Sequence, residues 1–302
     1  MTVIRANFSD LNNANFYRIA FEGYKDHPMV YDQIFNVKDS KRATEYISAV
    51  SGLAMPTAKA EGDDMGYDSP IQLYDGSVSH TTYAQGVRIT REALEDDEYD
   101  ILGERLFRAL GRGFNQRVET SAAAVFNNGF TTFTGPDGVA LFSTQHPKNP
   151  NEATTYISNR AATDADLSTT SLKAALTAFE NQTDERGLKF NQTAKILLVP
   201  ADLKWTAQEI LSSALEPYVA ENTKNVLNNS LRLIVWPFLT DADTWFLLGD
   251  KSDHNLNFFW RRKFNVKKDS DFDTDDAKYG ASMRFSTYVE KGWLGTYGVA
   301  GA

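Results

Sequence analysis

The sequence predicts an α+β fold in which one long helix and several short strands carry most of the buried surface. Three observations lead to this fold class. The stretch around Asp75-Gly76 predicts a β-hairpin, residues 90–128 predict a single long helix, and residues 168–265 predict short buried strands mixed with helices. With 302 residues, of which 42% are hydrophobic, the chain can bury one extended core or two smaller ones.

The composition excludes several function classes. The chain has no cysteine, so it has no disulfide, no thiolate metal ligand and no cysteine nucleophile. Its 31 basic and 40 acidic residues give a net charge of −9, which argues against a general binder of nucleic acid or of anionic membranes. The N-terminus lacks the apolar core of a signal peptide, and the longest apolar runs fall far short of the roughly 20 residues of a membrane-spanning helix. We therefore expect a soluble protein without a membrane segment.

The first 89 residues divide into two stretches. Residues 1–54 are mixed and polar, with no strong hydrophobic period. In residues 55–89, Asp75-Gly76 separates two alternating segments, and Asp-Gly suits both central positions of a tight hairpin turn. The second segment has no strongly apolar side, and a two-stranded hairpin without an apolar face is only marginally stable in water. We therefore expect this hairpin to lean on another surface.

Residues 90–128 predict one helix of unusual length, about 58 Å at ~1.5 Å per residue. Thr90 can cap its start, where the helix dipole favours the acidic residues found there. Apolar residues recur every four positions, at Leu102, Leu106, Leu110, Phe114, Val118, Ala122 and Phe126. A four-residue step advances about 40° around a helix, so this stripe winds around the rod and should meet several partners. Gly103, Gly111 and Gly113 can bend the rod, and two shorter helices are the alternative.

The rest of the chain alternates between loops and short elements. Residues 129–167 are rich in turn-forming residues, and residues 168–265 have an α/β pattern. A helix is expected after Ser168-Thr169-Thr170, and a second helix, which Asp202 can cap, is expected after a buried strand. The expected strands are Lys195–Val199, Leu231–Phe238, Trp245–Leu248, Leu256–Trp260 and Met283–Val289.

Candidate catalytic chemistry is sparse. The four histidines, His27, His80, His146 and His254, lack metal-ligand spacing, and the sequence contains no nucleophile elbow and no phosphate-binding loop. His146, which precedes Pro147, is the best candidate for a general base, but a hydrogen-bonded turn histidine is the favoured interpretation. We therefore predict no catalytic residue, no cofactor and no metal ligand.

Two charged segments near the C-terminus have alternative interpretations. Asp269–Asp276 begins like an EF-hand calcium loop, but Thr274 and Gly280 stand where that loop needs Gly and Glu, so a solvated acidic loop is expected. The basic residues between 261 and 268 lie beside aromatic residues and can contact nucleic-acid phosphate. The favoured interpretation is a strand end that faces solvent or the adjacent acidic loop.

The order of these segments resembles a known family. A weak hairpin, an overlong helix, an α/β domain and a returning strand occur in this order in the major capsid proteins of tailed bacteriophages, which have the Hong Kong 97-type fold. The resemblance covers roughly residues 50–298. It is carried by the Asp75-Gly76 hairpin, the 90–128 helix, Gly138–Pro147, Asn181–Gly187, Ile196–Leu203, Ile210-Leu211, Trp245–Asp250 and Lys291–Trp293.

The resemblance implies a domain organisation and a function. It implies an N-terminal arm (1–54), an extended loop (55–89), a peripheral domain with a spine helix (90–164, completed by 266–302) and an axial domain (165–265). A protein of this family self-assembles through hexamers and pentamers into an icosahedral shell around double-stranded DNA, inside the bacterial host, and becomes part of the virion. Portal, scaffolding and cement proteins are possible further partners. The alternatives are an encapsulin-like cargo shell and a hydrolase that depends on His146.

Two departures from the family pattern change what is expected of assembly. The arm begins near Met1, so scaffolding is expected to be a separate protein or to be absent. Some relatives cross-link through a lysine of the extended loop, but residues 60–87 contain no Lys or Arg, and Lys59 at the base of the loop is the nearest candidate. We therefore expect noncovalent contacts to hold the shell together.

Charge predicts which residues form the assembly interface. Five acidic residues lie in the extended loop, at Glu61, Asp63, Asp64, Asp68 and Asp75. In the long helix, Arg105, Arg108 and Arg112 are spaced by three and four residues, which places them on one helix face. We expect the acidic loop of one subunit to lie over these arginines of its neighbour. The alternative is pairing within one chain, for example Glu104 with Arg108.

Overall fold

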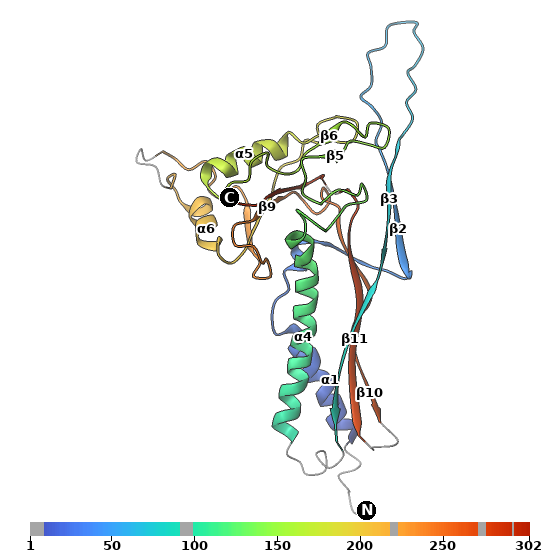
Figure 1. Ribbon diagram of the computed structural model, residues 1–302, viewed down its shortest axis with the longest axis vertical. Helices are drawn as coiled ribbons and strands as arrows, with labels where there is room; N and C mark the ends of the chain where they lie inside the picture. Colours follow the sequence, from blue (N-terminus) through green and yellow to red (C-terminus); the bar gives the residue numbers. More distant parts are fainter. Residues whose placement is uncertain (1–8, 91–98, 218–222, 271–275, 292) are drawn as a thin grey trace, which may run out of the picture.

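Two four-stranded sheets organise the chain, and a long loop projects beyond both of them (Figure 1). The structure, a computed structural model, describes residues 9–90, 99–217, 223–270, 276–291 and 293–302. One sheet is long and lies beside two helices, while the other sheet is short and has helices of its own (Figure 1). No helix in these ranges is both long enough and apolar enough to cross a membrane.

The long sheet has the strand order β1-β10-β11-β4. Its strands are β1 (Asn36–Asp39), β10 (Leu256–Ser270), β11 (Ala277–Val289) and β4 (Thr81–Ile89). Strand β11 pairs antiparallel with both of its neighbours, while β1 runs parallel to β10. The pairing of β10 shifts register on either side of Arg262. The strand expected at Leu256–Trp260 is therefore much longer than predicted and belongs to this sheet.

Helices α1 (Ser9–Lys25) and α4 (Tyr99–Asn127) cover one face of the long sheet (Figure 1). The single long helix predicted from the sequence is confirmed from Tyr99 onward, and residues 91–98 lie outside the described residues. Glycines in both helices allow α1 and α4 to approach each other closely. A Cβ added to Gly111 would lie 2.7 Å from the backbone nitrogen of Tyr24, and one added to Gly23 would lie 2.9 Å from the Cα of Arg108. The sequence did not predict α1.

The apolar stripe of α4 meets different partners along its length, as its winding predicts. Phe114 of the stripe contacts Phe264 of β10 at 5.1 Å between ring centroids. Beside the stripe, Phe107 stacks on Phe16 of α1 at 4.6 Å and meets Tyr279 of β11 edge-on. At its end, Phe126 contacts Phe246 of the second sheet at 5.1 Å. Leu106 is the exception, because 43% of its surface is exposed.

The second sheet has the strand order β12-β9-β7-β8. Its strands are β12 (Thr296–Val299), β9 (Trp245–Leu248), β7 (Ile196–Val199) and β8 (Arg232–Val235). One face packs toward Phe126 and shares the core of the long sheet, and the other face packs with α5 (Thr169–Glu180) and α6 (Lys204–Ser212). We expected residues 266–302 to complete the part that contains α4. Strand β11 lies in the long sheet, whereas β12 pairs with β9 of the second sheet.

Both helices predicted on either side of the buried strand β7 are present, as α5 and α6. Ser168 caps α5, and its hydroxyl and that of Ser171 form a reciprocal capping box. The predicted cap of α6 is wrong, because Leu203 occupies the N-cap position and no side chain bonds there. The remaining short elements are α2 (Tyr31–Ile34), β5 (His146–Pro147) and β6 (Tyr156–Ile157).

The predicted turn at Asp75-Gly76 is wrong. Both residues lie inside β3 (Gln72–Ser79), which pairs antiparallel with β2 (Thr44–Val50), so Gly76 faces Ile47 across the ladder. The connection between these strands is the long segment 51–71, and it forms the projecting loop in Figure 1. Gly76 instead makes room for Tyr288, whose hydroxyl lies where a Cβ would stand.

Candidate assembly surfaces

The outer end of the 51–71 loop carries exposed acidic and apolar side chains. Glu61, Asp63 and Asp64 are exposed, and the structure shows no side-chain partner for them among the described residues. Met55, Met65 and Tyr67 are also exposed, Tyr67 to 93%. A projecting loop with a bare aromatic ring and bare carboxylates has the character of a surface that another chain covers.

Arg186, which follows α5, fixes the base of the 51–71 loop. Its guanidinium donates to the Ser51 hydroxyl and to the Gly52 carbonyl, each at 3.2 Å, and to the Ser69 carbonyl at 2.5 Å. Arg186 therefore bridges the two sides of the loop where they come together. Asp68 also belongs to this base, 3.6 Å from the guanidinium of Arg186.

Two of the five predicted acidic residues thus have partners in their own chain. The backbone nitrogen of Ala54 donates to Asp68, and hydrogen bonds of this kind hold the pKa of that carboxyl below its usual value. Asp75 lies in β3 and accepts a hydrogen bond from the Gln72 amide at 2.9 Å. The projecting acidic group therefore consists of Glu61, Asp63 and Asp64, and we call these three residues the acidic tip.

The three predicted arginines of α4 differ in their surroundings. Arg108 donates to Asp26, directly after α1, at 2.9 Å, and Arg112 lies 3.6 Å from the same carboxylate. The hydrogen bond from Arg108 holds the pKa of Asp26 below its usual value. Arg105 is exposed and makes no ion pair with a described residue. Pairing within the chain therefore exists, but the partner is Asp26 and not Glu104.

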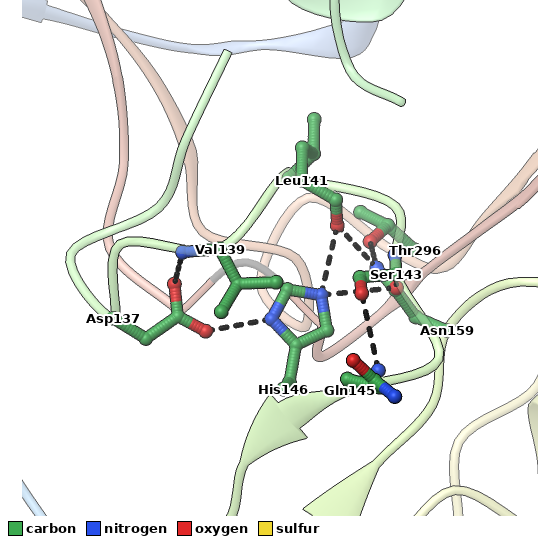
Figure 2. Close-up of polar contacts among 8 residues, drawn as sticks. All are labelled: Asp137, Val139, Leu141, Ser143, Gln145, His146, Asn159 and Thr296. Atoms are coloured by element: carbon green, nitrogen blue, oxygen red, sulfur yellow. Dashed lines mark hydrogen bonds and ion pairs between the residues drawn. The ribbon is translucent and has the colours of Figure 1, made fainter. Parts of the chain in front are cut away.

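His146 has a structural setting (Figure 2). Its Nδ1 lies 2.6 Å from Asp137 Oδ2, and its Nε2 lies 3.2 Å from both the Leu141 carbonyl and Asn159 Oδ1. The Asn159 amide is oriented by its own donation to Leu141 O at 2.7 Å. The ring is fully buried and both nitrogens face protein acceptors, whereas a general base needs a nitrogen that can reach a substrate. The expected hydrogen bonds are confirmed, but His146 lies in strand β5, where it pairs with Ile157 of β6, and not in a turn.

Glu119 of α4 is a buried acid that the sequence analysis missed. Its carboxylate accepts hydrogen bonds from the backbone nitrogens of Val30 and Tyr31 and, at 2.6 Å, from the Trp236 indole. Burial raises the pKa of Glu119, and these three donors oppose the rise. The residue joins the N-terminal segment, the long helix and the end of β8. The sequence signal for its burial was its position directly after Val118, a residue of the apolar stripe.

The fold thus combines a long sheet with one long helix beside it, a second sheet with its own helices and a projecting loop. The sequence matches the family described as phage capsid protein over residues 75–299, and the chain belongs to this family. It is therefore a phage major capsid protein, a structural component of the virion that self-associates into an icosahedral shell.

Solved structures share this fold at low sequence identity. The capsid of cyanophage P-SCSP1u matches 91% of this chain and 88% of its own, with a TM-score of 0.60 and 10% identity. The procapsid of bacteriophage JBD30 matches 99% of this chain and 77% of its own, with a TM-score of 0.55 and 17% identity. The virus-like particle from Pyrococcus furiosus matches 95% of this chain and 98% of its own, with a TM-score of 0.54 and 10% identity. A search of curated proteins finds no match to this sequence.

Proposed function

We propose that the shell encloses the double-stranded DNA of a tailed phage, and that it assembles in the bacterial host cytoplasm from hexamers and pentamers. The match to the phage capsid family over residues 75–299 is the observation that carries this proposal. The net charge of −9 supports it, because a negative wall can surround DNA without binding it tightly. Contact with DNA is then nonspecific, and portal, scaffolding and cement proteins would be separate partners.

The proposed roles of the segments follow the family pattern. Residues 1–54 would form an arm, the projecting loop would reach a neighbour, α4 would act as the spine of the peripheral domain, and the second sheet would form the axial domain. The pairing of β2 with β3 supports a loop that begins before residue 55. We propose no enzymatic activity, and the buried setting of His146 supports this proposal.

We also propose that the acidic loop of one subunit contacts the arginines of α4 in its neighbour. Arg105 supports it, because this side chain is exposed and has no ion-pair partner among the described residues. Arg108 and Arg112 are weaker candidates, since Asp26 of the same chain already lies beside both of them. Arg105→Glu is therefore a cleaner test of this contact than reversal of Arg108 and Arg112. The variant Asp26→Asn measures how much of any effect comes from within the chain.

The proposed function is tested by electron microscopy of the purified protein and by nuclease protection. Closed icosahedral shells that protect long double-stranded DNA during infection are the expected result. Shells that instead contain a bound cargo peptide would favour the encapsulin-like alternative. Monomers that hydrolyse a substrate, with loss of turnover in His146→Gln, would favour the enzyme alternative.

A further inference from the structure

The two edge strands of the long sheet differ in how they are protected from other chains. Strand β1 has four residues, and two of them, Lys38 and Asp39, are charged. Strand β4, at the other edge, has nine residues, of which only Arg88 is charged, and it contains no proline. It pairs with β11 without a register shift, and no described strand lies along its other side. Short length, charge, proline and bulges keep edge strands from pairing with other chains, and Thr81–Val87 has none of these devices.

The helix layer leaves room beside this edge. A hollow of about 390 Å³ lies between β4 and α4. Thr82–Gln85 line it on the strand, and Gly113, Phe114 and Arg117 line it on the helix. The Arg117 guanidinium lies 4.4 Å from the centre of the Tyr83 ring, so this ring forms part of an ordered wall. An added strand would therefore find space and an aromatic surface for its side chains on the helix side of the sheet.

Small residues leave a second hollow on the opposite face of the sheet. Ala84 and Gly86 of β4 line it together with Gly280 and Ser282 of β11, and its volume is about 400 Å³. A Cβ built on Gly280 would meet nothing within 4 Å. Successive residues of a strand point to opposite sides of a sheet, so the side chains of a strand added to β4 would reach the two hollows in turn. The edge therefore offers both the backbone and the side-chain sites that strand addition uses.

The sequence of β4 is complementary to a second copy of itself. Two copies paired antiparallel about Gln85, the central residue of the strand, would match the strand along its whole length. Such a pair places Tyr83 opposite Val87, and aromatic side chains opposite β-branched ones stabilise a ladder. Arg88 then lies opposite Thr82, so no like charges face each other. The two Gln85 side chains meet at the centre, where each amide can donate to the other.

We propose that β4 of one copy pairs antiparallel with β4 of a second copy about a twofold axis at Gln85, so that their two long sheets become one continuous sheet. This inference rests on the self-association of the proposed shell and names one contact within it. The long, nearly uncharged and self-complementary edge carries it, because a segment of another protein would not require β4 to match its own reverse. A twofold contact closes after two copies, so it would join subunits in pairs and leave their other surfaces to extend the shell.

A single introduced cysteine tests the twofold contact, because the chain has no cysteine of its own. Residues directly opposite each other in an antiparallel ladder have Cα atoms about 4.5–5.5 Å apart, a distance that a disulfide can span. We expect Gln85→Cys to give covalent dimers under mild oxidation, and a reducing agent to reverse them. The matched control is Thr82→Cys, which is exposed on the same strand. Its two copies would lie about 20 Å apart at ~3.4 Å per residue, so this variant should stay monomeric on non-reducing gels.

The outcomes separate this contact from the proposed function. Gln85→Cys chains that assemble but stay unlinked would overturn the inference, and so would equal linking in Thr82→Cys. If electron microscopy shows no shells for the wild-type chain, the proposed function fails. The trap still decides the inference in that case, because a pair of β4 strands does not need a closed shell, and the absence of the covalent dimer would overturn the contact.

Charge placed at the twofold axis gives an independent readout. Gln85→Lys alone and Gln85→Glu alone each put two like charges opposite each other, which destabilises a ladder. We expect each variant to reduce the yield of shells at least tenfold while the far-ultraviolet circular dichroism stays unchanged. An equal mixture of the two variants should restore shells, because opposite charges then meet at the axis. Normal shells from either variant alone would overturn the inference. Failure of the mixture would also overturn it and assign the edge to a different partner, such as an extended segment of another protein.

Discussion

The contact between α1 and α4 makes opposite predictions for two glycines of one helix. Gly111 is buried against α1, where a Cβ would lie 2.7 Å from the backbone nitrogen of Tyr24. Gly113 is exposed, and the nearest atom to its Cβ would be a side-chain oxygen of Gln85 at 4.0 Å. In both positions, replacement by Ala favours the helix by about 1 kcal/mol.

Only Gly111→Ala also forces two backbones apart. Overpacking of this kind costs about 1–3 kcal/mol, and the displaced α1 would weaken the stack of Phe16 on Phe107. Less the helix gain of about 1 kcal/mol, we expect Gly111→Ala to lower the free energy of unfolding by up to about 2 kcal/mol. Gly113→Ala should raise it by up to about 1 kcal/mol.

Urea unfolding of the unassembled chain, followed by circular dichroism, measures both changes. The slope of the transition must stay constant for the comparison to hold, since a changed slope signals a change in the folded or unfolded state. Comparing the two variants also cancels the effect of the Gly→Ala change on the entropy of the unfolded chain, which is the same at both sites. If Gly111→Ala were as stable as Gly113→Ala, the proposed role of Gly111 in close helix packing would be refuted.

Three further predictions concern buried or bridging polar groups. Glu119→Gln should lower the free energy of unfolding by about 2 kcal/mol in urea titrations, because one amide cannot accept from Trp236 and from the backbone as a carboxylate does. His254 is fully buried without a partner for either ring nitrogen among the described residues, and burial lowers its pKa from 6.5 to about 4. The native state therefore holds this ring neutral. The free energy of unfolding keeps its full value above pH 6.5 and falls by about 3 kcal/mol as the pH drops toward 4, because the unfolded chain binds the proton first. In His254→Leu the free energy of unfolding should depend less on pH over that range. Arg186→Ala should speed hydrogen exchange of the amides in residues 51–71 while the urea midpoint changes little, and an unchanged exchange rate would argue against its role at the base of the loop.

Local apolar patterns predicted the elements whose own residues are buried along their length. Residues Ile196–Val199 and Trp245–Leu248 are wholly apolar and buried on both faces of a central sheet, so their strands could be predicted from the sequence. That α4 is one unbroken helix from Tyr99 to Asn127 could likewise be predicted from a repeated apolar spacing.

Contacts between distant residues explain what could not be predicted. Asp75-Gly76 has the composition of a turn, but Tyr288 packs on Gly76 and β2 pairs with the segment, so tertiary contacts override the local preference. The partner of Arg108 lies 82 residues away, at Asp26. The pairing of Arg262 with Arg284 likewise depends on strand register, which no sequence pattern sets.

One apolar core runs without a break from the long sheet, past Phe126, to the near face of the second sheet. Interiors packed at this density resist compression and transmit strain. The subunit should therefore deform as one rigid unit under load and should not bend between its two sheets. Differences in curvature from one position in the shell to another must then be absorbed at the contacts between copies and in the thin connection at residues 51–71.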